Sequence, residues 1–276
     1  MYFTKCECDT LAFHPVNVPP GAEYQGWIID QGEEDVHQIA LVMVEMLTHQ
    51  RAYLAEHPDA YVLAGSTEFG LAVNKRHERP PFIAYVGGIA EMNRIDETAT
   101  DWRIGAAVPL DRVMAAVARD LPDFAEVLRR FGSPPIRSTA TLAGNIANGS
   151  PIGDSMPCLL ALGATLVLRQ RNAKGKEETR RVKLEDFYLG LKRTVLQPGE
   201  FIEAIEVPRP VNRHFRAHKI SKRFDCDISA VCAGLSITLS GDKVGTARLA
   251  FGGMAATVRH ATQAEAALVG QPWTAD

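Results

Sequence analysis

Ser138-Thr139-Ala140-Thr141-Leu142-Ala143-Gly144-Asn145-Ile146-Ala147-Asn148-Gly149-Ser150-Pro151-Ile152-Gly153-Asp154 is the stretch that decides the fold of this chain of 276 residues. It combines small residues and hydroxyls with two Asn and three Gly, and its charges, Arg137 and Asp154, stand at its two ends. Glycine permits positive φ and lets a ligand approach the backbone closely. Successive N–H groups then form a concave anion site suited to a pyrophosphate. The pattern predicts a loop that lies against a polar ligand.

A second turn of similar composition occurs earlier in the chain. The apolar residues 61–64 predict a short strand, Gly65-Ser66-Thr67-Glu68 predict a turn, and the residues from Phe69 onward predict a helix. The N-terminus of such a helix presents several unpaired N–H groups. By itself this turn is equally well an ordinary capped connection between a strand and a helix. Two such turns that converge on one phosphate group are a more specific signal of a phosphate-binding site than either turn alone.

Length and composition describe an ordinary globular protein. The length suits about two domains. The contents of 46% hydrophobic and 23% charged residues are typical of such proteins, and the net charge of −3 gives no reason to expect nucleic acid. The longest apolar runs are too short to span a membrane, and residues 1–8 lack the layout of a signal peptide. We therefore expect a cytoplasmic protein.

The five cysteines are Cys6, Cys8, Cys158, Cys226 and Cys232. An odd, scattered set in a chain of this length predicts free thiols in a reducing compartment. Cys6 and Cys8 form half of a metal site, but no second pair or histidine cluster completes it, and we expect no bound metal. The plant-type iron–sulfur spacing of cysteines, C-x₄-C-x₂-C, does not occur in the sequence.

The remaining pattern predicts helices and strands in an α+β arrangement. We expect a helix over 33–57 closed by Pro58, a strand over 81–86, a hairpin of 93–98 with 102–108, two helices within 110–131 broken at Leu121-Pro122, and a strand over 165–171. After Asp186 the pattern predicts strands over 201–207, 215–221, 228–239 and 244–251, a hairpin turn at Ser240-Gly241-Asp242-Lys243, and a last helix over 260–269. The predicted units are an atypical N-terminal segment, 1–58, a ligand-binding domain, 59–185, and a C-terminal α+β domain, 186–276.

Motifs of self-sufficient catalysis are missing from the sequence. It has no G-x-G-x-x-G, G-x-x-x-x-G-K-[ST], H-E-x-x-H or G-x-S-x-G. His214 and His218 stand four apart in a segment that is predicted to be a strand, where they share a face; a surface or core pair is the favoured interpretation. Any chemistry therefore comes from a cofactor, and we assign no catalytic side chain.

The two turns together resemble the FAD-binding domain of the xanthine dehydrogenase family, above all its bacterial small subunit. The segments that carry the resemblance are Ala64–Glu68, Thr141–Asp154, Phe187–Gly190, Leu196–Glu200, Lys219–Arg223 and Phe251–Ala255. The resemblance extends over about residues 59–273. It implies a two-subdomain α/β FAD-binding domain followed by an α+β domain with an antiparallel sheet.

The resemblance also implies a reaction and a set of site residues. In this family a molybdenum site oxidises a purine, [2Fe-2S] clusters pass the electrons to FAD, and FAD reduces NAD⁺. The resemblance implies that residues 63–68 hold the pyrophosphate and the adjacent ribose of FAD. It also implies that Leu196 and Lys219 lie near its isoalloxazine ring. The implied cofactor-binding residues are Leu63, Ala64, Gly65, Ser66, Thr67, Glu68, Ala140, Thr141, Gly144, Asn145, Ser150, Ile152, Asp154, Leu196 and Lys219.

Some features depart from the family pattern. The iron–sulfur module that precedes this domain in the family is missing, the first 50 or so residues do not resemble the family, and the chain stops where family members continue. We therefore expect a fragment, or iron–sulfur and molybdopterin-binding partner chains. The alternatives are the same fold in another hydroxylase (carbon monoxide dehydrogenase or aldehyde oxidase-like), a sugar-nucleotide reductase with a related FAD fold, and a flavin-free scaffold subunit.

Overall fold

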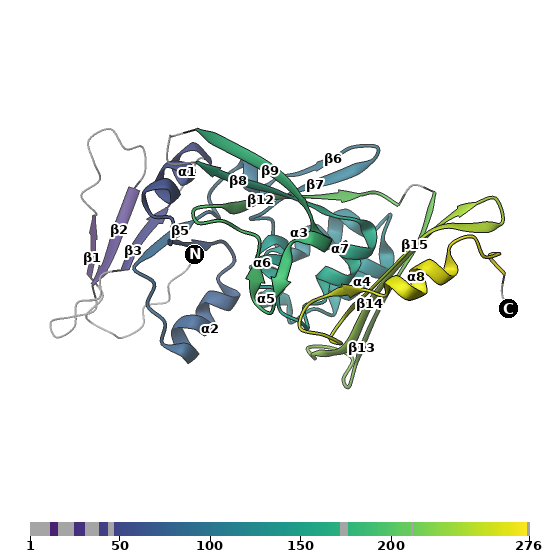
Figure 1. Ribbon diagram of the computed structural model, residues 1–276. Coiled ribbons are helices and arrows are strands. Elements are labelled where there is room, and N and C mark those ends of the chain that lie inside the picture. Colours follow the sequence, from purple (N-terminus) through teal and green to yellow (C-terminus); the bar gives the residue numbers. More distant parts are fainter. Residues whose placement is uncertain are drawn as a thin grey trace.

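Three larger β-sheets follow one another along the chain and across the molecule (Figure 1). The computed structural model describes residues 12–15, 25–30, 39–43, 47–171, 176–210 and 212–274. A separate two-stranded hairpin, formed by β10 (Tyr188–Gly190) and β11 (Arg193–Thr194), lies outside the three sheets. The mixture of helices with mainly antiparallel sheets confirms the predicted α+β class.

The first sheet has the strand order β1-β2-β3-β5-β4. Strand β5 pairs parallel with both β3 and β4, whereas β1 and β2 add antiparallel pairs on the other side of β3. The strands and helices of this part are β1 (Ala12–Pro15), β2 (Gln25–Asp30), β3 (Ile39–Met43), α1 (Leu47–Glu56), β4 (Tyr61–Leu63), α2 (Thr67–Arg76) and β5 (Phe82–Tyr85).

The prediction of one helix over 33–57 is wrong in its first half. Residues Ile39–Met43 form strand β3, and only Leu47–Glu56 form a helix. Apolar residues between positions 36 and 47 recur at helix spacing, but the five consecutive apolar residues 39–43 also fit the continuous apolar pattern of an interior strand. Pairing with a strand on either side, β2 and β5, is the tertiary contact that decides between them.

The middle sheet has the order β6-β7-β12-β8-β9 and is antiparallel throughout. The predicted hairpin is confirmed as β6 with β7, and the break at Leu121-Pro122 separates two helices as predicted. The elements are η1 (Glu91–Asn93), β6 (Ile95–Glu97), β7 (Asp101–Gly105), α3 (Leu110–Val117), α4 (Pro122–Arg129), α5 (Pro134–Arg137), α6 (Leu142–Asn148), α7 (Ser155–Leu162), β8 (Thr165–Arg171), β9 (Glu177–Lys183), η2 (Leu184–Asp186) and β12 (Phe201–Pro208).

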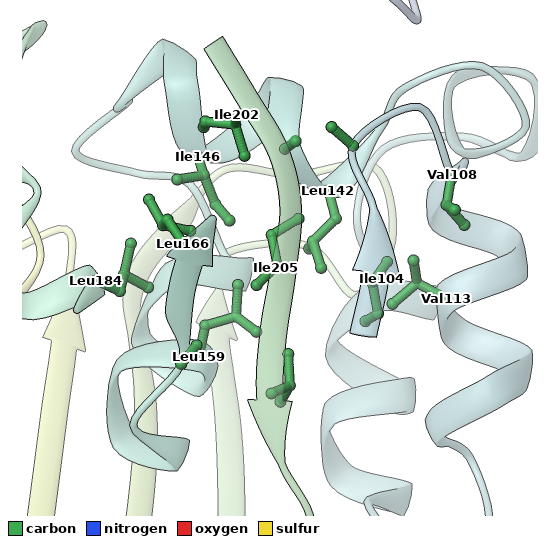
Figure 2. Close-up of a cluster of buried hydrophobic side chains, with 14 of the residues drawn as sticks. Ile104, Val108, Val113, Leu142, Ile146, Leu159, Leu166, Leu184, Ile202 and Ile205 are labelled. Carbon is green, nitrogen blue, oxygen red and sulfur yellow. The ribbon is translucent and has the colours of Figure 1, made fainter. Parts of the chain in front are cut away.

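The main hydrophobic core lies between this sheet and the helices on one of its faces. Figure 2 shows Ile104, Leu166 and Ile205 of the sheet directed toward Leu142 and Ile146 of α6, and all five side chains are fully buried. Helix α7 is apolar from Met156 to Leu162 and is buried along its whole length. The buried apolar side chains of residues 138–154, such as Leu142 and Ile146, therefore anchor this stretch in the core. They thereby fix the positions of the polar residues between them.

The C-terminal sheet has the order β13-β14-β15-β16, all antiparallel. Helix α7 packs directly on it: a Cβ on Gly234 would lie 2.4 Å from the Pro157 carbonyl oxygen. The predicted strands and last helix of this region are confirmed. The elements are β13 (Arg213–Ser221), β14 (Ser229–Ser240), β15 (Lys243–Gly252), β16 (Arg259–His260) and α8 (Thr262–Leu268).

Strand β12 changes how we divide the chain. The sequence analysis places it after residue 186, in the C-terminal domain, but it pairs with β7 and β8 at the centre of the middle sheet. Strand β3 likewise pairs with β5, across the expected border at residue 58. We propose that the ligand-binding unit extends from about residue 39 to 208, and that the C-terminal unit begins with β13.

Candidate functional site

A cleft of about 780 Å³ opens between the first and the middle sheet. This volume lies within the usual range for small-molecule and cofactor sites. Both turns that the sequence analysis selected line it. The predicted site residues in its wall are Leu63, Ala64, Gly65, Ser66, Thr67, Glu68, Ala140, Thr141, Gly144, Asn145 and Leu196.

The two turns touch each other at Gly65. A Cβ added there would lie 2.0 Å from the Thr139 carbonyl oxygen and 2.9 Å from the Cα of Ala140. The second turn is held from its other side, where the Leu110 N–H donates to the Ala140 carbonyl oxygen at 2.9 Å. Only glycine permits such an approach of two backbones. Residues about 75 positions apart in sequence are thereby brought onto one wall of the cleft.

The first turn directs the N-terminus of a ten-residue helix, α2, toward the cleft. Ser66 caps this helix with a left-handed backbone, φ 67°, which is uncommon outside glycine. Its carbonyl oxygen accepts the Gly70 N–H at 2.8 Å, so the N–H groups before Gly70 have no partner within the helix, and residues 67–69 line the cleft. This end of a helix carries a partial positive charge and suits an anion.

The second turn is rigid because side chains close it. The Thr141 hydroxyl accepts the Gly144 N–H at 3.0 Å and caps α6. The Ser155 hydroxyl donates to Asn145 Oδ1 at 2.5 Å. The Tyr188 hydroxyl donates to the Ile146 carbonyl oxygen at 2.9 Å, and burial raises the pKa of this tyrosine. The wall of the cleft is therefore formed in advance of any ligand.

Charged side chains gather at one part of the cleft around Glu68. Its carboxylate accepts from Arg76 at 3.2 Å and from Asn148 at 3.4 Å, and Lys192 Nζ lies 3.9 Å away. Burial, followed by the nearby Glu68 charge, raises the pKa of Tyr61. A carboxylate fixed in this way can accept hydrogen bonds from ligand hydroxyls.

Four predicted site residues do not line the cleft: Ser150, Ile152, Asp154 and Lys219. Asp154 and Lys219 are buried against each other, with Lys219 Nζ donating to Asp154 Oδ2 at 2.7 Å. The Ser229 hydroxyl also donates to Asp154 and accepts from Lys219 at 2.9 Å. The pair thus joins the end of the second turn to the C-terminal sheet. Ile152 is exposed and Ser150 is half-buried.

Some lining residues were missed by the sequence analysis. The half-buried Phe131 lines the cleft and stands seven positions before Ser138, where the apolar pattern indicates only the end of a helix. Others, such as Phe201 on β12, come from elements whose position depends on sheet pairing. The additional lining residues of most interest are Tyr61, Phe69, Arg76, Phe131, Asn148, Lys192 and Phe201.

Other predictions concern metals and membranes. Within the part of the chain that the structure describes, no three His, Cys, Asp or Glu side chains are grouped to hold a metal ion. Cys6 and Cys8 lie outside the described residues. His214 and His218 both lie on β13, and His214 stacks on Trp273 with ring centroids 6.2 Å apart. No helix among the described residues is long and apolar enough to cross a bilayer.

The cleft fits a dinucleotide such as FAD. The N-terminus of α2 suits a diphosphate, Glu68 suits a ribose, and an aromatic lining residue such as Phe131 suits a planar ring. Residues 38–210 match the family model described as the FAD binding domain in molybdopterin dehydrogenase, and residues 216–276 match the CO dehydrogenase flavoprotein C-terminal domain. The chain therefore belongs to the FAD-binding flavoproteins of the molybdenum hydroxylases.

The chain is similar to several members that differ in substrate. It is 31% identical over 96% of its length to "Xanthine dehydrogenase/oxidase" of Gallus gallus, and 33% identical over 80% to "Nicotinate hydroxylase hnxS" of Emericella nidulans. It spans 21% and 18% of the lengths of these two relatives. Carbon monoxide dehydrogenase from Hydrogenophaga pseudoflava shares its fold, with TM-score 0.76 and 26% identity over 84% of this chain and 80% of that chain. Membership of the family confirms the resemblance seen in the sequence.

Proposed function

We propose that the chain holds FAD in the cleft and passes electrons from an iron–sulfur partner to NAD⁺, as part of a xanthine dehydrogenase-like enzyme. The observation that carries the proposal is the contact at Gly65, which joins both turns on one cleft. When bound, FAD supplies the electron transfer itself. The enzyme's substrate is oxidised elsewhere, at a molybdenum cofactor on a partner domain or chain.

The protein's own residues bind and orient in this proposal. N–H groups at the start of α2 hold the diphosphate, and the Glu68 carboxylate accepts hydrogen bonds from a ribose. Phe131 and Leu196 pack beside the planar ring. The hydrogen bond from the Ser155 hydroxyl to Asn145 Oδ1 fixes the orientation of the Asn145 side-chain amide within the second turn. No side chain is assigned a proton-transfer role, because a bound FAD would supply the redox chemistry itself.

A second candidate is the same flavoprotein in another hydroxylase. The likeness to a nicotinate hydroxylase at 33% identity is no weaker than the likeness to xanthine dehydrogenases, and carbon monoxide dehydrogenase shares the fold. Substrate choice belongs to the molybdenum-bearing part in either case. Assays of the assembled enzyme with xanthine, nicotinate and carbon monoxide would separate the candidates, because only one substrate should reduce the flavin rapidly.

The absorption spectrum of the purified chain, before and after FAD is added, tests the proposal. Flavin bands that stay with the protein through gel filtration support the cofactor assignment. Bleaching of those bands by NADH supports a nicotinamide partner. A chain that is folded by circular dichroism and never retains flavin would overturn the proposal. If flavin is retained but only dithionite reduces it, the assignment of NAD⁺ as the electron acceptor is refuted and the assignment of FAD as the cofactor still holds.

A further inference from the structure

We propose that Ser155 decides which group the second turn offers to a ligand, by holding the Asn145 side-chain amide with its nitrogen toward the cleft. This role rests on the proposed function and adds to it a positioning residue that does not itself touch the cofactor. Asn145 lines the cleft and is half-buried. Ser155 is the first residue of α7, has no exposed surface and does not line the cleft. Any effect of its hydroxyl on a ligand must therefore pass through a neighbouring residue.

One hydrogen bond can join these two side chains in either of two ways. In the first, the Ser155 hydroxyl donates to Asn145 Oδ1, and the amide nitrogen is left for the cleft. In the second, the amide nitrogen donates to the hydroxyl oxygen, the hydroxyl proton goes to another acceptor, and the amide oxygen is left for the cleft. The two ends of an asparagine amide have nearly the same shape, so their hydrogen-bond partners decide which way the amide lies.

The distance and the available acceptors favour the first way. Ser155 Oγ lies 2.5 Å from Asn145 Oδ1. Such a distance is usual between an O–H donor and an oxygen acceptor, and it is shorter than the range of about 2.7–3.2 Å for an N–H donor. The second way would send the hydroxyl proton to Met156 Sδ, 3.5 Å from Ser155 Oγ. A thioether sulfur is a weak acceptor, so the proton is better placed on the amide oxygen.

The backbone at this point of the turn has its donors already in use. The Gly144 N–H donates to the Thr141 hydroxyl at 3.0 Å, and the Asn145 N–H donates to the Thr141 carbonyl oxygen at 3.1 Å. The side-chain NH₂ of Asn145 is the donor of these two residues that a ligand can use. An amide NH₂ donates hydrogen bonds and does not accept them. The position therefore suits an oxygen acceptor, such as a phosphate or carbonyl oxygen of FAD.

A double-mutant cycle on the full chain tests the role of Ser155, with the dissociation constant for FAD measured by quenching of flavin fluorescence. Ser155→Ala should weaken FAD binding about three- to tenfold, because the amide loses the hydrogen bond that orients it. In the Asn145→Ala background the same change should cost less than about twofold, since no amide remains to be oriented. Equal losses in the two backgrounds, or no loss in either, would overturn the inference.

Ser236→Ala and Met156→Leu are the matched controls. Ser236 is buried like Ser155, but it lies on β14 and does not line the cleft. Met156→Leu removes the sulfur and nearly conserves the volume of the side chain. Both variants should keep FAD affinity within about twofold of the wild-type value. A loss for Ser236→Ala as large as that for Ser155→Ala would make the effect a general one of buried hydroxyls, and the same loss for Met156→Leu would give the hydroxyl proton to sulfur; either would overturn the inference.

Proton exchange of the Asn145 side-chain NH₂, followed by NMR in the isotopically labelled wild-type chain, determines the orientation without relying on affinities. The resonance is identified by its loss in Asn145→Ala. We expect fast exchange with water in the free chain and slower exchange with FAD bound, because the NH₂ then donates to the cofactor. Exchange that is slow in the free chain and fast in Ser155→Ala would put the nitrogen on Ser155 and overturn the inference, as would exchange that bound FAD leaves unchanged. A wild-type chain that binds no FAD would refute the proposed function, and exchange in the free chain would still decide the orientation.

Discussion

Replacing Gly65 by alanine should separate the two turns that form the cleft. The added Cβ would lie 2.0 Å from the Thr139 carbonyl oxygen, about 1 Å inside the closest approach that Cβ atoms make in real proteins. The contact is with backbone, so no side chain can rotate away. Overpacking of this kind costs about 1–3 kcal/mol. If about 1.4 kcal/mol of that strain is relieved by parting the turns and must be restored when FAD binds, FAD affinity falls about tenfold.

Gly70→Ala is the matched control, because it adds the same methyl group five residues further along the chain, inside helix α2. No atom lies within 4 Å of the Cβ that it would add, and the position is inside α2. Glycine within a helix is less favourable than alanine by about 0.5–1 kcal/mol. We expect this variant to be as stable as the wild type or slightly more so, with unchanged FAD affinity.

Two measurements on the same samples decide the outcome. Urea unfolding gives the free energy of unfolding, and quenching of flavin fluorescence gives the dissociation constant for FAD. The reasoning fails if Gly65→Ala matches the wild type in both. If stability falls while FAD affinity is unchanged, the contact is structural and the cleft is not the FAD site.

Three further predictions concern charge and exposure. Lys219→Met should lower the free energy of unfolding by about 3–5 kcal/mol, because it leaves the Asp154 carboxylate buried without its partner; a loss below about 1 kcal/mol in urea would contradict the buried pair. The Arg119 guanidinium lowers the pKa of Asp120 to about 2. Its folded pKa is thus below the unfolded value, so its contribution to stability should be present above about pH 4 and lost as the pH falls through about 2; carboxyl NMR showing protonation near pH 4 would refute this. Iodoacetamide should alkylate the exposed Cys226 in the native protein and spare the two buried cysteines of the described region; equal labelling of all three would contradict the fold there.

Local signals in the sequence were sufficient for much of the fold. The break at Leu121-Pro122 stops one helix and starts another because proline fits the first turn of a helix and not its interior. The turn at Ser240-Gly241-Asp242-Lys243 joins β14 to β15 because Gly241 supplies a φ of +65°. Both features depend on residues within a few positions, which is the range that periodicity and turn chemistry can resolve.

Features that depend on distant pairing were beyond this range. Strand β12 has the same apolar pattern as the strands of the C-terminal sheet, yet it pairs with β7 and β8, whose paired residues lie more than 30 positions earlier. Nothing in residues 201–208 distinguishes these partners from β13. The same holds for β3, where the apolar run agrees with a helix until its neighbours on both sides are known. In both cases the hydrogen-bonding partner, and not the local residue type, determines the structure.

Asp154 and Lys219 present the same problem within the site. Resemblance to the family assigns both to the flavin, but a motif gives residue types and spacing without saying which groups meet. In the structure each satisfies the other, and together with Ser229 they leave little unpaired polarity for a ligand. Breaking such a pair to bind a cofactor would expose each charge to a cost of several kcal/mol. We therefore expect the pair to stay intact when FAD binds in the cleft, where it holds the second turn against the C-terminal sheet, and its influence on the cofactor should be through position. Lys219→Met should then weaken FAD binding only as far as it loosens that junction, so that affinity and stability fall together.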